Sequence, residues 1–153
     1  MNQISVNLVG PCPNNAGLCN QLFQIAAALS YAEKYNFEAV FPCLLEDKYG
    51  GYVNNILRTL STEDTFHFTD YFGESDFSYA PIPKKDNSFC IVNSYLQSEK
   101  YFSENRELIL NTFTLPEEDK AYLEDKYGDI LKQGATSLHI RRTDYINLKN
   151  NHV

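Results

Sequence analysis

Polar and apolar positions alternate at the start of the chain and then recur at helical spacing. Alternation over residues 4–9 predicts a strand, and residues 10–17, rich in glycine, proline and asparagine, predict a loop. Residues 20–34 predict a helix that ends near Asn36, and residues 38–41 predict a short second strand. Strand, loop, helix and strand in this order make a βαβ unit, in which the two strands are parallel.

The predicted helix over residues 20–34 carries one apolar stripe. Gln21, Gln24 and Glu33 flank this stripe, and we expect them at its polar borders. The stripe consists of Leu22, Phe23, Ala26, Leu29 and Ala32.

The rest of the chain predicts a short helix, an aromatic-rich stretch of extended segments and turns, a buried strand, two longer helices and a last strand. In this order they occupy residues 53–60, 65–83, 89–93, 98–113, 117–131 and 136–141. The second of the longer helices begins with acidic residues, which suits the positive end of a helix. Strands that alternate with helices predict an α/β fold, with a parallel sheet flanked by helices.

Composition narrows the class of protein. A chain of 153 residues with 43% hydrophobic and 22% charged residues is typical of a globular domain. The net charge of −7 argues against nucleic acid as a partner, because phosphate-backbone binding depends on lysine and arginine. We find no signal segment at the start and no run near the ~20 apolar residues of a membrane helix. We therefore expect a cytoplasmic protein without a membrane span.

Cysteine spacing favours free thiols over disulfides. Cys12, Cys19, Cys43 and Cys90 form no C-x-x-C pair, and no secretory signal accompanies them. Their spacing does not fit the patterns that zinc prefers, so a metal site on Cys12 and Cys19 is the less favoured alternative. We expect buried free thiols and no metal.

The start of the first helix is the first candidate site. A helix amino terminus offers unpaired N–H groups to an anion or a sugar hydroxyl, and Gly17 would let a ligand approach the backbone closely. The segment has neither a G-x-G-x-x-G fingerprint nor a Walker lysine. Taken alone, it favours Asn20 as a plain helix cap.

Residues 95–102 are the second candidate. Their pattern favours a junction between a strand and a helix, with the aromatic side chains in the core. The alternative is a polar rim, formed by Gln97, Glu99 and Lys100, near an acceptor hydroxyl.

The third candidate lies at the end of the last predicted strand. Ligands of open α/β sheets bind outside the carboxyl ends of strands, and the forked guanidinium groups of Arg141 and Arg142 suit a phosphate or diphosphate there. Alternation places His139 with Arg141 on one side and Arg142 with Asp144 on the other. The alternative is that the arginines face solvent or pair with acidic side chains, and that His139 is an ordinary buried histidine.

Together, in this order, the three segments resemble the α-1,2-fucosyltransferases of glycosyltransferase family 11. The family's G-G-L-G-N-Q-M-F-Q-Y-A is matched from its second glycine onward by residues 17–26, and its F/L-Q-S-E-K-Y-F by residues 96–102. Its H-V/I-R-R-G-D-Y is matched by residues 139–145.

The chain departs from the family pattern at three glycines. Ala16 and Cys19 replace two glycines of the first motif, from which we expect a tighter loop that is less open to the donor. Thr143 replaces the glycine of the third motif. The resulting R-R-T-D resembles the motif of α-1,6-fucosyltransferases, so we expect it to be tolerated.

The resemblance implies a GT-B-type arrangement, in which two Rossmann-like domains face each other across GDP-fucose. Residues 1–134 would form the amino-terminal domain, and residues 135–153 the opening strand and loop of a truncated donor-binding domain. It also implies an inverting transfer of fucose from GDP-fucose to a hydroxyl of a glycan acceptor, without metal or other cofactor.

The same resemblance implies roles for individual residues. Arg141 would grip the β-phosphate and stabilise the departing GDP, and Asn20 would reach the sugar–phosphate end of the donor. A fixed guanidinium suits this role, because negative charge builds on the diphosphate as the sugar leaves. The remaining donor-binding residues would be Gly17, Gln21, His139, Arg142 and Asp144.

In the resembled family much of the donor-binding domain follows the third motif, whereas this sequence ends at Val153. We therefore expect an amino-terminal half that needs a complementing chain or a second copy. Two alternatives are a non-catalytic carbohydrate- or nucleotide-binding remnant and an unrelated α/β interaction domain.

If the chain is an amino-terminal half, we expect that by itself it neither binds GDP-fucose tightly nor turns it over. Calorimetry with GDP should give no micromolar binding. Micromolar binding that disappears in Arg141→Ala would contradict this expectation.

Overall fold

The computed structural model describes residues 1–7, 17–45, 52–62, 66–138 and 140. The chain divides into two compact units, Met1–Thr114 and Leu115–Val153. The predicted boundary at residue 134 follows from the family resemblance and stays a prediction.

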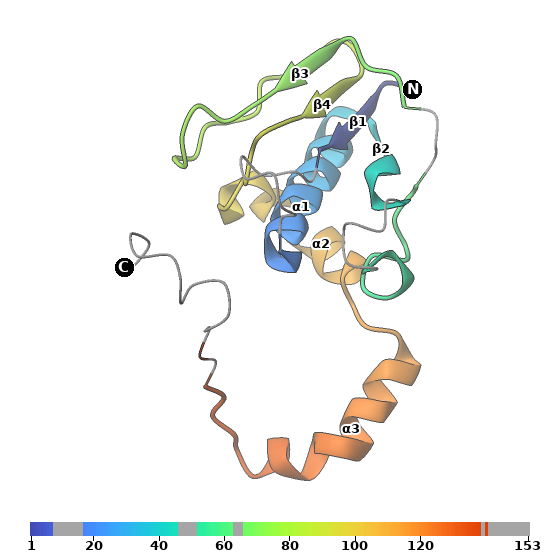
Figure 1. The fold of residues 1–153 in the computed structure, drawn as a ribbon, viewed down its shortest axis with the longest axis vertical. Helices are drawn as coiled ribbons and strands as arrows, with labels where there is room; N and C mark the ends of the chain where they lie inside the picture. Colours follow the sequence, from blue (N-terminus) through green and yellow to red (C-terminus); the bar gives the residue numbers. More distant parts are fainter. Residues whose placement is uncertain (8–16, 46–51, 63–65, 139, 141–153) are drawn as a thin grey trace. The chain divides into compact units, whose positions relative to one another are not determined.

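A four-stranded parallel sheet forms the centre of the first unit. Its strands stand in the order β2-β1-β4-β3 and are β1 (Gln3–Val6), β2 (Glu38–Ala39), β3 (Asp70–Phe72) and β4 (Phe89–Ile91). Helix α1 (Leu18–Tyr35) connects β1 to β2 and packs along the sheet (Figure 1). The predicted α/β fold with parallel strands is confirmed.

Helix α1 starts earlier than the sequence predicted. Gly17 is the N-cap and makes no side-chain hydrogen bond, while the Gly17 carbonyl accepts from the Gln21 N–H at 3.1 Å. The interpretation of Asn20 as a helix cap is therefore wrong, because Asn20 already lies inside the first turn. The predicted end is confirmed, since Asn36 adopts the left-handed conformation (φ 56°) that commonly terminates helices.

The face of α1 that meets the sheet also differs from the predicted stripe. Gln21 and Gln24 are buried, each with 1% of its surface exposed, whereas Leu22 and Phe23 are only half-buried. The buried face is centred on the glutamines, the alanines and Tyr31 rather than on Leu22 and Phe23. Its buried residues are Gln21, Gln24, Ile25, Ala26, Ala27, Ala28, Ser30, Tyr31 and Ala32.

The core lies between α1 and the sheet. The Tyr31 ring lies 5.3 Å from the Phe37 ring and 5.0 Å from the Phe89 ring, both edge-on, which is a favoured aromatic geometry. The cluster consists of Ile4, Val6, Ile25, Ala27, Ala28, Tyr31, Ala32, Phe37, Phe41, Leu44, Leu57, Phe89, Ile91 and Leu96.

The helix predicted over residues 98–113 is interrupted. It consists of η4 (Glu99–Tyr101), η5 (Ser103–Asn105) and α2 (Arg106–Thr112). The break lies at Phe102, whose φ of −141° leaves the helical region while its ring packs 5.9 Å from the Phe23 ring. Tertiary packing therefore overrides the local helical pattern.

The described residues between β2 and β3 include two short 3-10 helices. The strand predicted over residues 38–41 ends at Ala39, and Pro42 begins the 3-10 helix η1 (Pro42–Leu45). The short helix predicted over residues 53–60 is reduced to η3 (Tyr52–Asn54), which turns follow.

The second unit contains α3 (Glu117–Lys132), which agrees with the helix predicted over residues 117–131. The described residues of the predicted last strand, 136–138 and 140, belong to no strand, and Leu138 and Ile140 are 84% and 68% exposed. A strand needs a neighbour to receive its backbone hydrogen bonds, and no other strand of the described chain pairs with this segment.

Substitution of Ile91 by alanine tests the packing of β4. Ile91→Ala should lower the free energy of unfolding by about 2–5 kcal/mol, because the side chain is 1% exposed and its removal leaves a cavity. Ile130→Ala is the matched control, since Ile130 on α3 is 57% exposed. Urea unfolding measures both, and equal losses would contradict the assigned core.

Candidate functional site

The carboxyl ends of β1 and β4 meet at one edge of the sheet, because the two strands are adjacent and parallel. The chain leaving β1 leads to the start of α1, and the chain leaving β4 leads to Gln97. Asn20 Oδ1 accepts a hydrogen bond from Gln97 Nε2 at 2.7 Å, which joins residues 77 positions apart. We call this contact the Asn20–Gln97 pair.

The backbone at the start of α1 is open toward this pair. The first N–H groups of a helix lack carbonyl partners within the helix, and the N-cap Gly17 has no side chain with which to cap those of α1. A Cβ built on Gly17 would meet nothing within 4 Å, so the space beside the N-cap is unoccupied by the described residues. Together with the helix dipole, this end favours a negatively charged or oxygen-rich group.

Gln24 carries an unusual buried amide below the same helix end. Its Oε1 and Nε2 atoms have no hydrogen-bond partner in the described part of the chain, although the residue is 1% exposed. Buried polar atoms are normally paired, and side chains of a helix lean toward its amino terminus. Gln24 therefore offers a donor and an acceptor beneath the helix start. An amide beside an apolar stripe predicts a polar border, and the burial of Gln24 shows that this prediction is wrong.

The loop after β4 has a strained backbone. Asn93 and Leu96 have positive φ angles of 51° and 52°. Asparagine tolerates this conformation, but it costs a bulky residue about 1 kcal/mol or more, and Leu96 is fully buried. The loop holds Gln97 in place with this strained geometry.

Glu74 stabilises the strained loop. Its Oε2 atom accepts hydrogen bonds from the backbone N–H groups of Tyr95 and Leu96 at 2.8 and 2.9 Å. Its Oε1 atom accepts from the Tyr101 hydroxyl at 3.0 Å. Burial raises the pKa of Tyr101 to about 12, so this phenol is a neutral donor at physiological pH. Sequence reasoning did not single out Glu74.

The structure thus brings together the first two candidate segments. Gly17, Asn20 and Gln97 lie at the accessible edge, whereas the predicted donor-binding residue Gln21 is buried beneath it. Leu96 and the half-buried aromatic residues of the second segment contribute to packing, as the junction interpretation predicted. The third segment, with His139, Arg141, Arg142 and Asp144, lies outside the described residues.

The cysteines provide no evidence of a metal centre. Cys19, Cys43 and Cys90 belong to no disulfide among the described residues, and of these three the prediction of a buried thiol is confirmed for Cys90 alone, while Cys12 lies outside the described residues. Burial raises the pKa of the Cys90 thiol to about 12, so it stays protonated and unreactive. Within the described ranges, no three His, Cys, Asp or Glu side chains gather as metal ligands would.

No family model, curated protein or solved structure matches this chain. Among the helices that the structure describes, none combines the length and the apolar character needed to cross a membrane.

Substitution of Glu74 tests whether its carboxylate holds the loop after β4. Glu74→Ala should cost about 1.5–3 kcal/mol, because hydrogen bonds to a charged acceptor are lost. It should also speed amide hydrogen exchange at Tyr95 and Leu96, measured by NMR. Glu74→Gln, which keeps one oxygen acceptor, should recover part of the protection, and exchange unchanged in Glu74→Ala would contradict the assigned role.

Proposed function

We propose that this chain is the amino-terminal part of a GDP-fucose-dependent α-1,2-fucosyltransferase with a GT-B-type, Rossmann-like architecture. The supporting observation is the Asn20–Gln97 pair. It joins two of the three segments that carry the family resemblance, at the edge of the sheet where α/β proteins bind ligands. The two motifs, which were matched by sequence alone, therefore lie in contact, as residues of one site would.

The side-chain amide of Asn20 has a donor group that could contact the sugar donor. Its Oδ1 atom is occupied by Gln97, whereas its Nδ2 group donates no hydrogen bond to any described residue. Gln97 therefore fixes the amide, and both N–H bonds of Asn20 stay available for oxygen atoms of the sugar or the phosphate. In this arrangement Gln97 is a positioning residue and Asn20 is the residue that contacts the donor.

The proposed reaction is a displacement at C1 of fucose. The acceptor hydroxyl oxygen forms the new bond to C1 while the bond from C1 to the β-phosphate oxygen breaks with inversion. The bonding electrons leave with GDP, and the hydroxyl proton passes to a base. Donors at the start of α1 and, by the resemblance, the guanidinium of Arg141 stabilise the negative charge that develops on the diphosphate. The acceptor is a glycan, and we place the reaction in the cytoplasm.

The donor contact can be tested on the chain itself by NMR. Titration of the ¹⁵N-labelled chain with GDP-fucose should shift the amide signals of residues 17–21 and Gln97, with weak, millimolar affinity. Asn20→Ala should abolish the shifts, and Gln97→Ala should weaken them because the amide loses its support.

The control is Asn111→Ala, which removes an exposed amide on α2. Shifts that are absent from both segments, or that persist in Asn20→Ala, would overturn the proposal. A donor-hydrolysis assay on the chain and on any longer product of the same gene separates a transferase from a remnant that only binds.

A further inference from the structure

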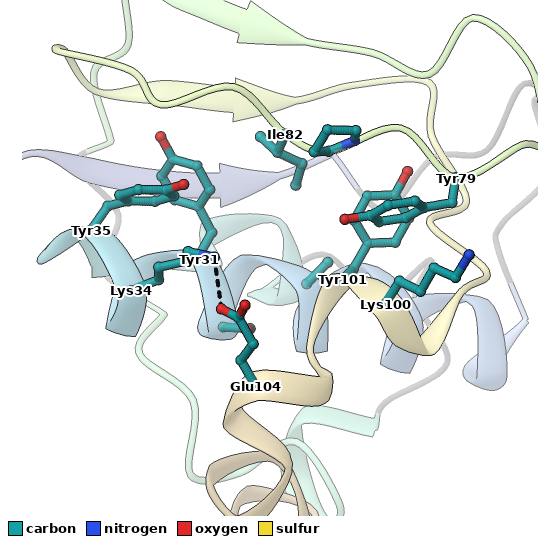
Figure 2. Close-up of a pocket in the computed structure, with 11 residues that line it drawn as sticks. Tyr31, Lys34, Tyr35, Tyr79, Ile82, Lys100, Tyr101 and Glu104 are labelled. Atoms are coloured by element: carbon teal, nitrogen blue, oxygen red, sulfur yellow. Dashed lines mark hydrogen bonds and ion pairs between the residues drawn. The ribbon is translucent and has the colours of Figure 1, made fainter.

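A second polar site lies along the same helix, away from the Asn20–Gln97 pair. A cavity of about 100 Å³ lies between the second half of α1 and the chain around residues 79–82 and 100–104. Figure 2 shows Tyr31 and Tyr35 at one end and Tyr79 and Tyr101 at the other. We call it the tyrosine cavity.

Two of the tyrosines form rigid walls. The Tyr31 hydroxyl accepts from the Lys85 N–H at 2.7 Å, and the Tyr101 hydroxyl donates to Glu74 at 3.0 Å. Burial raises the pKa of both phenols, so they remain neutral. Hydrogen bonds at the far end of each ring fix its orientation before any ligand arrives, which lowers the entropic cost of binding.

Among the described residues, three other polar groups of the cavity are unpaired, those of Tyr35, Tyr79 and Lys100. The hydroxyls of Tyr35 and Tyr79 make no hydrogen bond within the described chain, and Lys100 forms no ion pair there. Lys100 Nζ lies 5.4 Å from the centre of the Tyr79 ring. Below them, Lys34 and Glu104 pair at 2.7 Å in the cavity wall (Figure 2).

We propose that the tyrosine cavity binds one pyranose ring of a glycan. A pyranose has apolar C–H faces and a rim of hydroxyls, and the cavity offers tyrosine rings together with unpaired hydroxyls and an ammonium group. The cavity of about 100 Å³ is smaller than the ~150 Å³ that holds benzene, so one edge of the sugar ring would enter it and the rest of the ring would stay outside.

A flat nucleobase fits the same cavity less well. The paired rings are inclined by 53° for Tyr31 and Tyr35 and by 61° for Tyr79 and Tyr101. Neither pair therefore offers parallel faces, whereas a puckered sugar ring can contact inclined surfaces with different edges.

The position of the cavity indicates which part of the acceptor the bound sugar ring would be. Ala27, in the cavity wall, follows Asn20 by seven residues of α1, which is about 10 Å along the helix axis. The bound ring would therefore be a remote part of the acceptor, beyond the sugar that receives fucose. This role as an acceptor subsite rests on the proposed function, but the binding of saccharide does not.

Saturation-transfer NMR on the full chain tests the proposal with lactose and the methyl glycosides of galactose, glucose and N-acetylglucosamine. At least one should receive saturation, with millimolar affinity. Tyr79→Ala should weaken binding ~tenfold through loss of an aromatic wall, and Tyr79→Phe about two- to tenfold through loss of the hydroxyl.

Tyr71→Ala is the matched control, because Tyr71 on β3 is 67% exposed and lies outside the cavity. Lys100→Met provides a second variant that should weaken binding and leaves the aromatic walls intact. Circular dichroism checks that each variant is folded.

Three results would overturn the proposal: no saturation of any saccharide, binding unchanged in Tyr79→Ala and Lys100→Met, or displacement of the saccharide by GDP. The outcomes separate it from the proposed function. Saccharide binding without GDP-fucose shifts at residues 17–21 would leave the cavity assigned and overturn the transferase. GDP-fucose shifts at residues 17–21 without saccharide binding would support the transferase and overturn the assignment of the cavity.

Discussion

Parallel pairing of β1 with β4 determines where the candidate site lies. Ile4, Ser5 and Val6 pair with Phe89, Cys90 and Ile91, and the Asn7 N–H continues the ladder to the Ile91 carbonyl at 2.7 Å. Both strands therefore end at the same edge, and the segments that follow them are delivered to one place. An antiparallel arrangement would have placed the start of α1 and Gln97 at opposite ends of the sheet.

Glu74 links the two proposed sites through one carboxylate. One oxygen holds the strained loop that carries Gln97, and the other holds the Tyr101 ring in the wall of the tyrosine cavity. The acid lies just after β3, next to β4 in the sheet, so the order of the strands brings it to this loop. A change at Glu74 should therefore affect both sites, even though its carboxylate belongs to neither binding surface.

Local signals in the sequence predicted most of the secondary structure. The βαβ unit, the left-handed end at Asn36 and helix α3 follow from spacing and from residue preferences that act within a few positions. The break at Phe102 could not be predicted in this way, because its cause is a ring contact with Phe23, far away along the chain.

The candidate site was predictable only in part, for the same reason. Asn20 and Gln97 were both singled out from the sequence, but nothing in the pattern placed them in contact. Glu74 carries no local signal, since its three acceptor contacts reach residues more than twenty positions away. The burial of Gln24 depends on how α1 is rotated about its axis when it packs against the strands. The spacing of apolar residues predicts that rotation only to within the width of one apolar stripe.

Helix α1 carries residues of both proposed sites and so fixes the distance between them. Its first turn carries Asn20 and the N–H groups that Gly17 cannot cap, and its later turns form one wall of the tyrosine cavity. A helix of 18 residues extends about 27 Å, so both features have fixed positions on one element. The proposed donor contact and the proposed glycan contact would therefore lie at a constant separation. An acceptor longer than one sugar could reach both, and its length would decide which hydroxyl meets the donor.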